Sequence, residues 1–372
     1  MKINNVFYFS CCLVFAGLLT ACGNKEPLRI GFIAGTSGRV ADLGVGGRNG
    51  VTLAMELRNA AGGINGRTIE LLARDDQQDP ERARAAAQEL IEQKVTAILG
   101  PMTSAMAMQV VPFGNQHHVV VLGGTVTTNQ LTGKDDYFFR VLAPTRKFAS
   151  ANAVYQLKLG HKRFAIAYDL RNRAYTESWL DDFEAAVESG GGKVIKIIGF
   201  ESGNNVPFGD IAEKLLGTKP DCVVFISNSV DAANLVQQVR SRNKKVALAT
   251  SEWAGTERFI QLAGRVAEGV VLGQYLDRYS TQPDFIEFRN RYLKRFSQEP
   301  GYPAMVSYNA ANALFEAIAQ QHKGEDLKQT LLRIKTFKGL QEPTVFDQFG
   351  DASSRPYLVS VQDGKFVVIN SR

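Results

Sequence analysis

Short apolar segments alternate with amphipathic segments along most of this 372-residue chain, and this alternation restricts the possible folds more than any other feature of the sequence. The apolar segments have the length of strands, and the amphipathic segments have the spacing of helices. Alternating strands and helices are typical of parallel sheets built from strand–helix–strand units. In the first part of the chain we expect strands at 28–35, 68–76, 95–101, 118–124 and 137–143, and helices at 50–60, 80–93 and 103–116.

The same pattern begins again near residue 145. Two similar halves predict an α/β protein with two doubly wound, parallel-sheet domains in tandem. In the second part we expect strands at 163–169, 193–200, 222–227, 246–253 and 268–276, and helices at 177–191, 208–218 and 231–242. Beyond them the sequence predicts helices at 282–296 and 304–321 and a β-hairpin region at 344–369.

A glycine-rich segment, Gly44–Gly50, follows the first expected strand. Dinucleotide-binding proteins carry the spacing G-x-G-x-x-G at such a place, and this segment does not fit that spacing. We therefore interpret the glycines as a flexible loop and expect no nucleotide cofactor.

The first 21 residues have the layout of a secretory signal, because Lys2 precedes an apolar run, Val6–Ala21, that ends in small residues. The run is shorter than a comfortable membrane span, which needs about 20 apolar residues. The segment Leu19–Cys22 resembles the bacterial lipobox, whose cysteine becomes the lipidated first residue of the mature chain. The simpler alternative is an ordinary signal peptide with an incidental cysteine. We expect Cys22 to be lipidated and to anchor the protein to a membrane outside the cytoplasm.

Cysteine usage and charge agree with this interpretation. The cysteines are Cys11, Cys12, Cys22 and Cys222. After removal of the signal and lipidation of Cys22, Cys222 would remain alone in an apolar strand, so a large core rather than an internal disulfide must stabilise the protein. The net charge of +6 comes from scattered basic residues, which do not alternate with stacking aromatic residues and therefore do not indicate nucleic-acid binding.

No pattern in the chain indicates catalysis or metal binding. The paired carboxylates at 75–76 and 181–182 fall at a strand end and on a polar helix face, and no nucleophile–base motif accompanies them. The histidines have no partner at metal-ligand spacing. They are His117, His118, His161 and His322. We expect a binding protein, not an enzyme, without a metal or cofactor.

Several motifs, in their order and spacing, resemble the type I periplasmic solute-binding proteins of the branched-chain amino-acid family, which are the extracytoplasmic receptors of ABC importers. The motifs are RIGFIAGTSGRVADLGVGG, AILGPMTSAMA, VVVLGGTVTTNQLT, FFRVLAPT, AYTESW and SYNAANAL. The resemblance covers about residues 28–372, nearly the whole chain.

The resemblance implies two α/β lobes that are joined by crossing hinge strands and close on a ligand. It implies an N-terminal lobe of residues 28–144 plus about 275–345, and a C-terminal lobe of residues 145–274 plus about 346–372. The implied ligand is an amino acid or a related small carboxylate. The implied partners are an ABC permease and its ATPase, and we expect a monomer.

Thr103 and Ser104 follow an expected strand and begin a helix, where free N–H groups and the helix dipole favour an anion. The alternative is that one of them only caps the helix. The resemblance places Ser104 where the family binds a ligand carboxylate.

The segment Thr125, Val126 and Thr127 follows the next strand and offers hydroxyl groups and exposed backbone at the edge where parallel sheets bind ligands. A plain turn is the alternative. The resemblance implies that this segment binds both the carboxylate and the ammonium group of an amino acid.

Glu252 and Trp253 follow a strand of the second half. A carboxylate there suits a ligand ammonium group, and an indole adds a cation–π face. The alternative is an acidic residue that stabilises a helix start. In the family the position of Glu252 holds the ammonium group. The resemblance also places Tyr175 over the ligand, Leu43 beside the ligand side chain, and Asn228 where leucine-type receptors have an aromatic residue.

These residues favour a transport receptor. A sensor or regulatory lipoprotein on the same fold is the first alternative, and nothing in the sequence separates it from transport. A regulator of envelope synthesis without a small ligand is disfavoured by the presence of Ser104, Thr127 and Glu252.

Overall fold

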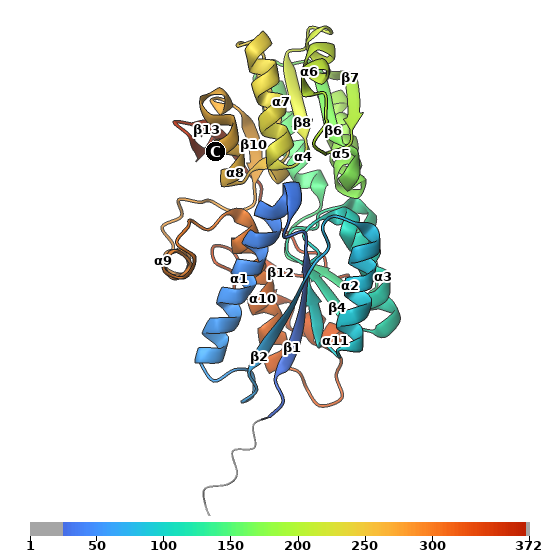
Figure 1. Ribbon diagram of the computed structural model, residues 1–372, viewed down its shortest axis with the longest axis vertical. Coiled ribbons are helices and arrows are strands. Elements are labelled where there is room, and N and C mark those ends of the chain that lie inside the picture. Colours follow the sequence, from blue (N-terminus) through green and yellow to red (C-terminus); the bar gives the residue numbers. More distant parts are fainter. Residues whose placement is uncertain (1–24, 370–372) are drawn as a thin grey trace, which may run out of the picture.

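The computed structural model describes residues 25–369, so the expected signal peptide and Cys22 lie outside the described residues. Two lobes are stacked along the long axis of the molecule (Figure 1). The lower lobe contains the blue and teal first part of the chain together with orange helices from its end, and the upper lobe contains the green and yellow middle part. Each lobe is built around one sheet.

The first sheet contains parallel strands in the order β2-β1-β3-β4-β5. The strands β3 and β4 are buried on both faces, which explains their uninterrupted apolar sequences. The strand bounds are β1 (Leu28–Ala34), β2 (Ile69–Asp75), β3 (Ala97–Leu99), β4 (Val120–Gly123) and β5 (Phe138–Arg140).

The second sheet repeats this arrangement. Its parallel strands have the order β7-β6-β8-β9-β10, and β13 and β14 extend it in antiparallel orientation. The bounds are β6 (Arg163–Asp169), β7 (Lys193–Phe200), β8 (Cys222–Ile226), β9 (Ala247–Thr250), β10 (Val271–Gln274), β13 (Tyr357–Gln362) and β14 (Lys365–Val368). The shared strand order confirms the prediction of two doubly wound halves.

Helices cover both faces of each sheet. In the lower lobe α1 (Ala41–Ala60) packs against α10 (Tyr302–Ala319), and α2 (Pro80–Glu92) packs against α3 (Ser104–His117). Proline at the first position of α2 and the Asp79 carboxylate, which accepts a hydrogen bond from Arg82 N–H, explain why this helix begins where it does. The upper lobe has α4 (Thr145–Lys158) and α5 (Arg173–Ser189) as one pair, and α6 (Phe208–Leu216), α7 (Ser229–Arg242) and α8 (Glu257–Ala263) as a second group.

The end of the chain returns to the lower lobe before it completes the upper sheet. The helices α9 (Pro283–Phe296) and α11 (Leu327–Ile334) accompany α10, and a short ribbon of β11 (Thr336–Phe337) and β12 (Thr344–Val345) follows them. Within residues 25–369 the chain therefore crosses between the lobes between β5 and α4, between β10 and α9, and between β12 and β13.

The glycine-rich segment Gly44–Gly50 is helical, so its interpretation as a flexible loop is wrong. It forms the first half of α1, which begins at Ala41. A Cβ atom at Gly44 would clash with the carbonyl oxygen of Gly35 at the end of β1, and one at Gly50 would clash with the carbonyl oxygen of Ala304 in α10. The glycines therefore allow close helix packing, which outweighs their low helix propensity.

Two further expectations can be compared with the structure. The C-terminal hairpin is present, with its turn at Asp363 and Gly364. Cys222 lies fully buried in β8, and burial raises the pKa of its thiol. Of the helices between residues 25 and 369, none has both the length and the apolar character needed to cross a bilayer.

Candidate functional site

A cavity lies between the two lobes, next to segments that follow strands of both sheets. In such sheets ligands bind beyond the carboxyl ends of the strands, where the strand order reverses, and here that point lies between β1 and β3. The cavity is narrow, with a volume of about 10 Å3. Its walls are Leu43, Met102, Thr103, Ser104, Thr125, Asn172, Tyr175, Trp253, Tyr275 and Tyr302.

Ser104 is the first residue of α3 and is almost fully buried. Its Oγ atom accepts hydrogen bonds from the N–H groups of Thr127 and Thr128, at 3.4 Å each. A hydroxyl group has two acceptor positions and one donor, so these contacts leave the hydroxyl hydrogen for another acceptor. The geometry makes Ser104 a donor that can bind a carboxylate oxygen.

The neighbouring threonines add polar groups of different character. The Thr125 hydroxyl donates to the carbonyl oxygen of Met102, so Thr125 remains available as an acceptor. The Oγ1 atoms of Thr103 and Thr127 are buried and have no hydrogen-bond partner within the described residues. Buried polar groups are normally hydrogen-bonded, and because Thr103 lines the cavity, a bound molecule could supply the partner of its hydroxyl group.

A buried arginine holds the loop that follows β4. The Arg140 guanidinium forms an ion pair with Asp351, and it also donates to the carbonyl oxygen of Thr128 and to the hydroxyl of Thr132. Asp351 in turn accepts a hydrogen bond from the N–H group of Gly133 at 2.8 Å. These contacts fix the segment 128–133, which directly follows Thr127.

Glu252 supplies a buried carboxyl group from the second lobe. Its Oε2 atom accepts a hydrogen bond from Trp179 Nε1 at 2.9 Å, while its Oε1 atom is buried without a hydrogen-bond partner among the described residues. Burial raises the pKa of Glu252 to about 7, and hydrogen bonding to its own backbone, to Trp179 and to the nearby Tyr175 and Tyr275 opposes this rise only in part. A cationic group at Oε1 would stabilise the ionised carboxylate.

Aromatic side chains surround the space between Glu252 and the first lobe. The rings of Tyr175 and Trp253 meet edge to face with centroids 5.6 Å apart, and the rings of Tyr275 and Tyr302 lie 5.2 Å apart. Burial raises the pKa of all three tyrosines well above the ordinary value, and the nearby Glu252 charge raises it further. The tyrosines are therefore neutral at physiological pH.

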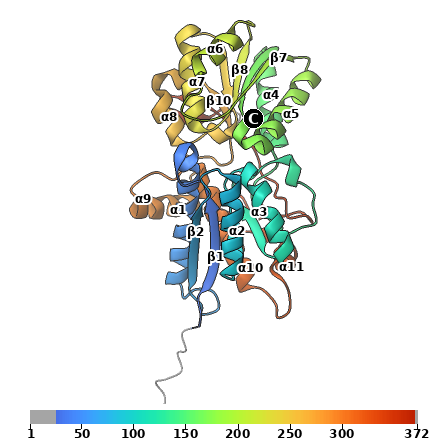
Figure 2. The same cartoon turned by 45° about the vertical axis from the view of Figure 1, so that its right-hand side comes forward.

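The lobes are in direct contact around the cavity, and Figure 2 shows the start of α1 against the upper lobe. The Asp42 carboxylate in α1 accepts hydrogen bonds from the hydroxyls of Ser229 and Thr256. Arg39 forms an ion pair of 2.7 Å with the buried Asp231 of α7. The described structure is thus a closed arrangement of the lobes.

The structure brings most of the sequence-predicted ligand residues together. Leu43, Thr103, Ser104, Thr125, Tyr175 and Trp253 line the cavity. Glu252 lies behind its aromatic wall, and the backbone of Thr127 contacts Ser104. By contrast, Val126 is packed in the core between α3 and β5, and Asn228 caps α7 by accepting from Val230 N–H and Asp231 N–H.

Sequence analysis did not identify Met102, Asn172, Tyr275 and Tyr302 as cavity residues. Tyr275 follows β10 and Tyr302 begins α10, and neither position is part of a local motif. The signal that was available for Asn172 is its place in the turn between β6 and α5, three residues before Tyr175.

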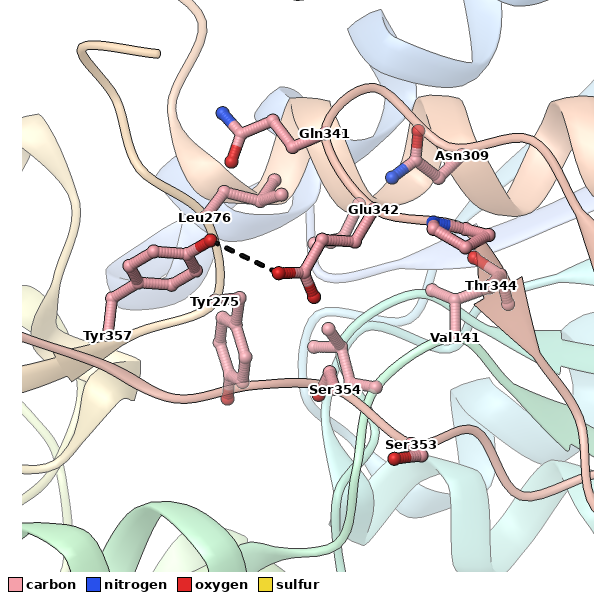
Figure 3. A pocket seen from close by; sticks show the side chains of 13 residues that line it. Val141, Tyr275, Leu276, Asn309, Gln341, Glu342, Thr344, Ser353, Ser354 and Tyr357 are labelled. Atoms are coloured by element: carbon pink, nitrogen blue, oxygen red, sulfur yellow. Dashed lines mark hydrogen bonds between the residues drawn. The ribbon is translucent and has the colours of Figure 1, made fainter.

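A second cavity, of about 40 Å3, lies among the segments that cross between the lobes (Figure 3). Val141 comes from the first crossing, Leu276 from the second and Ser354 from the third. Glu342 points into this cavity, and its carboxylate accepts a hydrogen bond of 3.4 Å from the Tyr357 hydroxyl. Tyr275 lines both cavities, so it separates the hinge region from the space between the lobes.

Comparisons with known proteins agree with the two-lobed fold. A family model described as "Periplasmic binding protein" matches residues 27–365. The Leu/Ile/Val-binding protein homolog 3 of Brucella melitensis is 25% identical over 346 residues, which are 91% of this chain and 93% of that protein.

Solved structures of similar proteins share the fold. A branched-chain amino acid transporter substrate binding protein from Streptococcus pneumoniae, in complex with isoleucine, has a TM-score of 0.83 at 23% identity, with 91% of this chain and 97% of that chain covered. An ABC transporter solute binding protein from R. palustris, in complex with benzoate, also has a TM-score of 0.83, at 19% identity, with 92% and 95% covered.

Proposed function

We propose that this chain, which belongs to the periplasmic binding protein family, captures an amino acid between its two lobes and delivers it to the permease and ATPase of an ABC importer. An extracytoplasmic location follows from the family. The expectation that the protein is not an enzyme agrees with a family of binding proteins.

One observation carries the choice of ligand: the first lobe places a hydroxyl group in the cavity wall, and the second lobe places a buried carboxyl group behind the aromatic side chains that line the cavity. Ser104 offers a hydroxyl hydrogen at the start of α3, which suits a carboxylate. Glu252 offers a carboxylate oxygen without a partner among the described residues, which suits an ammonium group. A zwitterion satisfies both sites at once, and the aromatic side chains between them suit an apolar side chain.

A small aromatic acid is the second candidate. The pKa of Glu252, raised by burial to about 7, allows a neutral carboxyl group that needs no ammonium partner. The aromatic lining would then pack against the ring of the ligand, and a similar solved protein binds benzoate. The two candidates differ in whether Glu252 contributes to affinity.

Titration calorimetry with L-leucine, its 2-keto acid and benzoate tests these candidates. Loss of one partner of a buried charged contact typically costs about 2–5 kcal/mol, so Glu252→Ala should bind L-leucine roughly 30-fold to several thousand-fold more weakly. Ser104→Ala should lose less, about 1.5 kcal/mol, which is the low end for a hydrogen bond to a charged group, because the free N–H groups at the start of α3 still bind the carboxylate. If Glu252→Ala binds L-leucine as well as the wild type, the ammonium site is wrong. Tight benzoate binding by both proteins would then support the second candidate.

We also propose a lipid anchor at Cys22, which lies outside the described residues. Its support is the sequence Leu19-Thr20-Ala21-Cys22 at the end of an apolar run. One acyl chain binds a membrane weakly, whereas several chains hold it stably. Cys22→Ser should leave a protein that is neither acylated nor retained in the membrane fraction. Equal retention of the variant would contradict the anchor.

The lobe boundaries, the monomeric state and the choice between transport and sensing remain part of the proposal. The division of strands between the two sheets supports a first lobe of residues 28–144 plus about 275–345, with the rest of the chain from 145 in the second. Genes for a permease and an ATPase beside the gene for this protein would favour transport over sensing.

A further inference from the structure

Asn172 makes an unusual contact for a residue at its position. It ends a short 3-10 turn after β6 and occupies the N-cap position of α5. An asparagine at an N-cap normally accepts a hydrogen bond from the first turn of its own helix. Asn172 makes no such bond, and instead its Oδ1 atom accepts a hydrogen bond of 2.9 Å from the N–H group of Ala105 in the other lobe.

This contact fixes the orientation of the Asn172 amide. The Ala105 N–H group is a donor, so the atom that faces it must be the oxygen of the side chain. The Nδ2 atom consequently points elsewhere, and it has no hydrogen-bond partner within residues 25–369. Asn172 is only 3% exposed, and it lines the cavity beside Ser104.

We propose that Asn172 is a ligand-binding residue whose Nδ2 group donates to the ligand carboxylate only when the lobes are closed. This inference rests on the proposed function, since it concerns the carboxylate that Ser104 binds. In the open state Ser104 and the start of α3 bind the carboxylate from one lobe. On closure Asn172 takes the Ala105 N–H group and adds its own N–H donor from the second lobe.

This exchange links ligand binding to lobe closure. A ligand shifts a conformational equilibrium only by its differential affinity for the two states. An N–H donor that reaches the carboxylate in the closed state alone provides such a difference. A ligand without an acceptor at this position would gain nothing from Asn172 and would close the lobes less effectively.

Two substitutions separate this role from that of a simple bridge between the lobes. Asn172→Asp keeps an oxygen that accepts from Ala105 N–H, but it replaces the Nδ2 donor by a second oxygen that repels a carboxylate. Asn172→Ala removes both groups and leaves the Ala105 N–H group free to bind the ligand itself. A donor role predicts that the aspartate variant is the weaker binder, whereas a bridging role predicts that the alanine variant is.

The experiment measures the affinities of L-leucine and L-leucinamide, which differ only in the carboxylate, by calorimetry. Loss of a hydrogen bond to a charged group corresponds to roughly a 10-fold to 150-fold change in affinity. We expect Asn172→Asp to bind L-leucine about 100-fold more weakly than the wild type, or more weakly still. The affinity of Asn172→Ala for L-leucine should lie between those of the wild type and the aspartate variant. The aspartate variant should also lose the preference for L-leucine over L-leucinamide. Ser178→Ala is the control, because Ser178 contacts Thr128 across the lobes without lining the cavity.

The outcomes are distinguishable. If the wild type binds L-leucine and Asn172→Asp binds it equally well, the inference about Asn172 is wrong and the proposed function stands. If Asn172→Ala is the weaker of the two variants, Asn172 is a bridge and not a donor. If the wild type binds neither L-leucine nor benzoate, the proposed function is wrong and the inference fails with it. Thermal unfolding of each variant checks that the lobes remain folded.

Discussion

Arg140 at the end of β5 and Asp351 on the last crossing segment form a buried ion pair, with Nη2 and Oδ1 2.7 Å apart. The pair joins the loop that carries Thr127 to the segment that leads into β13. Burial lowers the pKa of Arg140, while the Asp351 charge opposes this effect. The local structure of the carboxylate site thus depends on a residue that does not line the cavity.

Arg140→Met should therefore lower the free energy of unfolding markedly. Removal of one partner of a buried pair typically costs about 3–5 kcal/mol, because the other charge remains buried without compensation. Denaturant unfolding measures this change. The matched control is Arg289→Met, whose pair with Glu299 is about half exposed, so its loss should cost at most about 1 kcal/mol. Equal effects of both substitutions would contradict the structural role of Arg140.

The glycines of α1 give a prediction with a control in the same helix. Gly50→Ala should destabilise the protein by more than about 1 kcal/mol, because its Cβ would clash with the backbone of Ala304 and force α1 away from α10. Gly46→Ala places its Cβ 3.3 Å from Pro303 Cβ, and the higher helix propensity of alanine, about 1 kcal/mol, offsets this tighter contact. The unfolding temperature of Gly50→Ala should therefore be lower than that of Gly46→Ala. The opposite order would disprove the packing argument.

Glu252 should make stability depend on pH. Its pKa is raised from 4.5 to about 7, so between these values the folded protein holds a proton that the unfolded chain has lost. The free energy of unfolding should consequently fall as the pH rises through this window, by roughly 3 kcal/mol in total. Glu252→Gln should remove this part of the slope and be more stable than the wild type at pH 8.

The difference in pH dependence between the wild type and Glu252→Gln reports on Glu252 alone. Asp76 and Asp169, whose pKa values burial raises to about 6, are present in both proteins. Urea unfolding without ligand at pH 5, 6, 7 and 8 measures the difference. An ammonium ligand requires the ionised carboxylate, so L-leucine affinity should rise with pH up to about 7 and then level off. If the free energy of unfolding changes with pH in the same way for the wild type and Glu252→Gln, the Glu252 carboxyl group does not titrate in this range.

Asp42 should contribute to the closed state. Its carboxylate accepts hydrogen bonds from Ser229 and Thr256 across the lobes, so Asp42→Ala removes contacts that an open state does not make. We expect a larger radius of gyration for the variant without ligand, measured by small-angle scattering, and a weaker apparent affinity in proportion to the lost closed population. Asp284→Ala serves as the control, since Asp284 pairs with Lys338 on the surface. A radius unchanged from the wild type would argue against the role of Asp42.

The fold could be predicted from the sequence because the pattern of apolar residues that specifies each strand and helix is local. Each strand buried on both faces is an uninterrupted apolar run, and each helix carries an apolar stripe. The site followed in part, because residues just beyond parallel strands, such as Ser104 and Trp253, gather at one edge of a sheet.

The remaining features depend on contacts between distant segments. The glycines of α1 are needed because the carbonyl groups of Gly35 and Ala304 lie against them. No local sequence pattern predicts these contacts. Tyr275 and Tyr302 reach the cavity from crossing segments, and Asn172 reaches it by a bond to the other lobe. Proximity to a strand end also does not fix where a side chain points, which is why Val126 lies in the core.

The burial of Cys222 makes this protein suited to site-selective labelling. Its thiol is the one free thiol among residues 25–369, it is inaccessible in β8, and its raised pKa keeps it protonated at neutral pH. Maleimide dyes react with exposed thiolates, so a cysteine introduced on the surface of each lobe would react in preference to Cys222. A donor and an acceptor dye attached in this way would report the distance between the lobes in single molecules, without any need to remove the native cysteine.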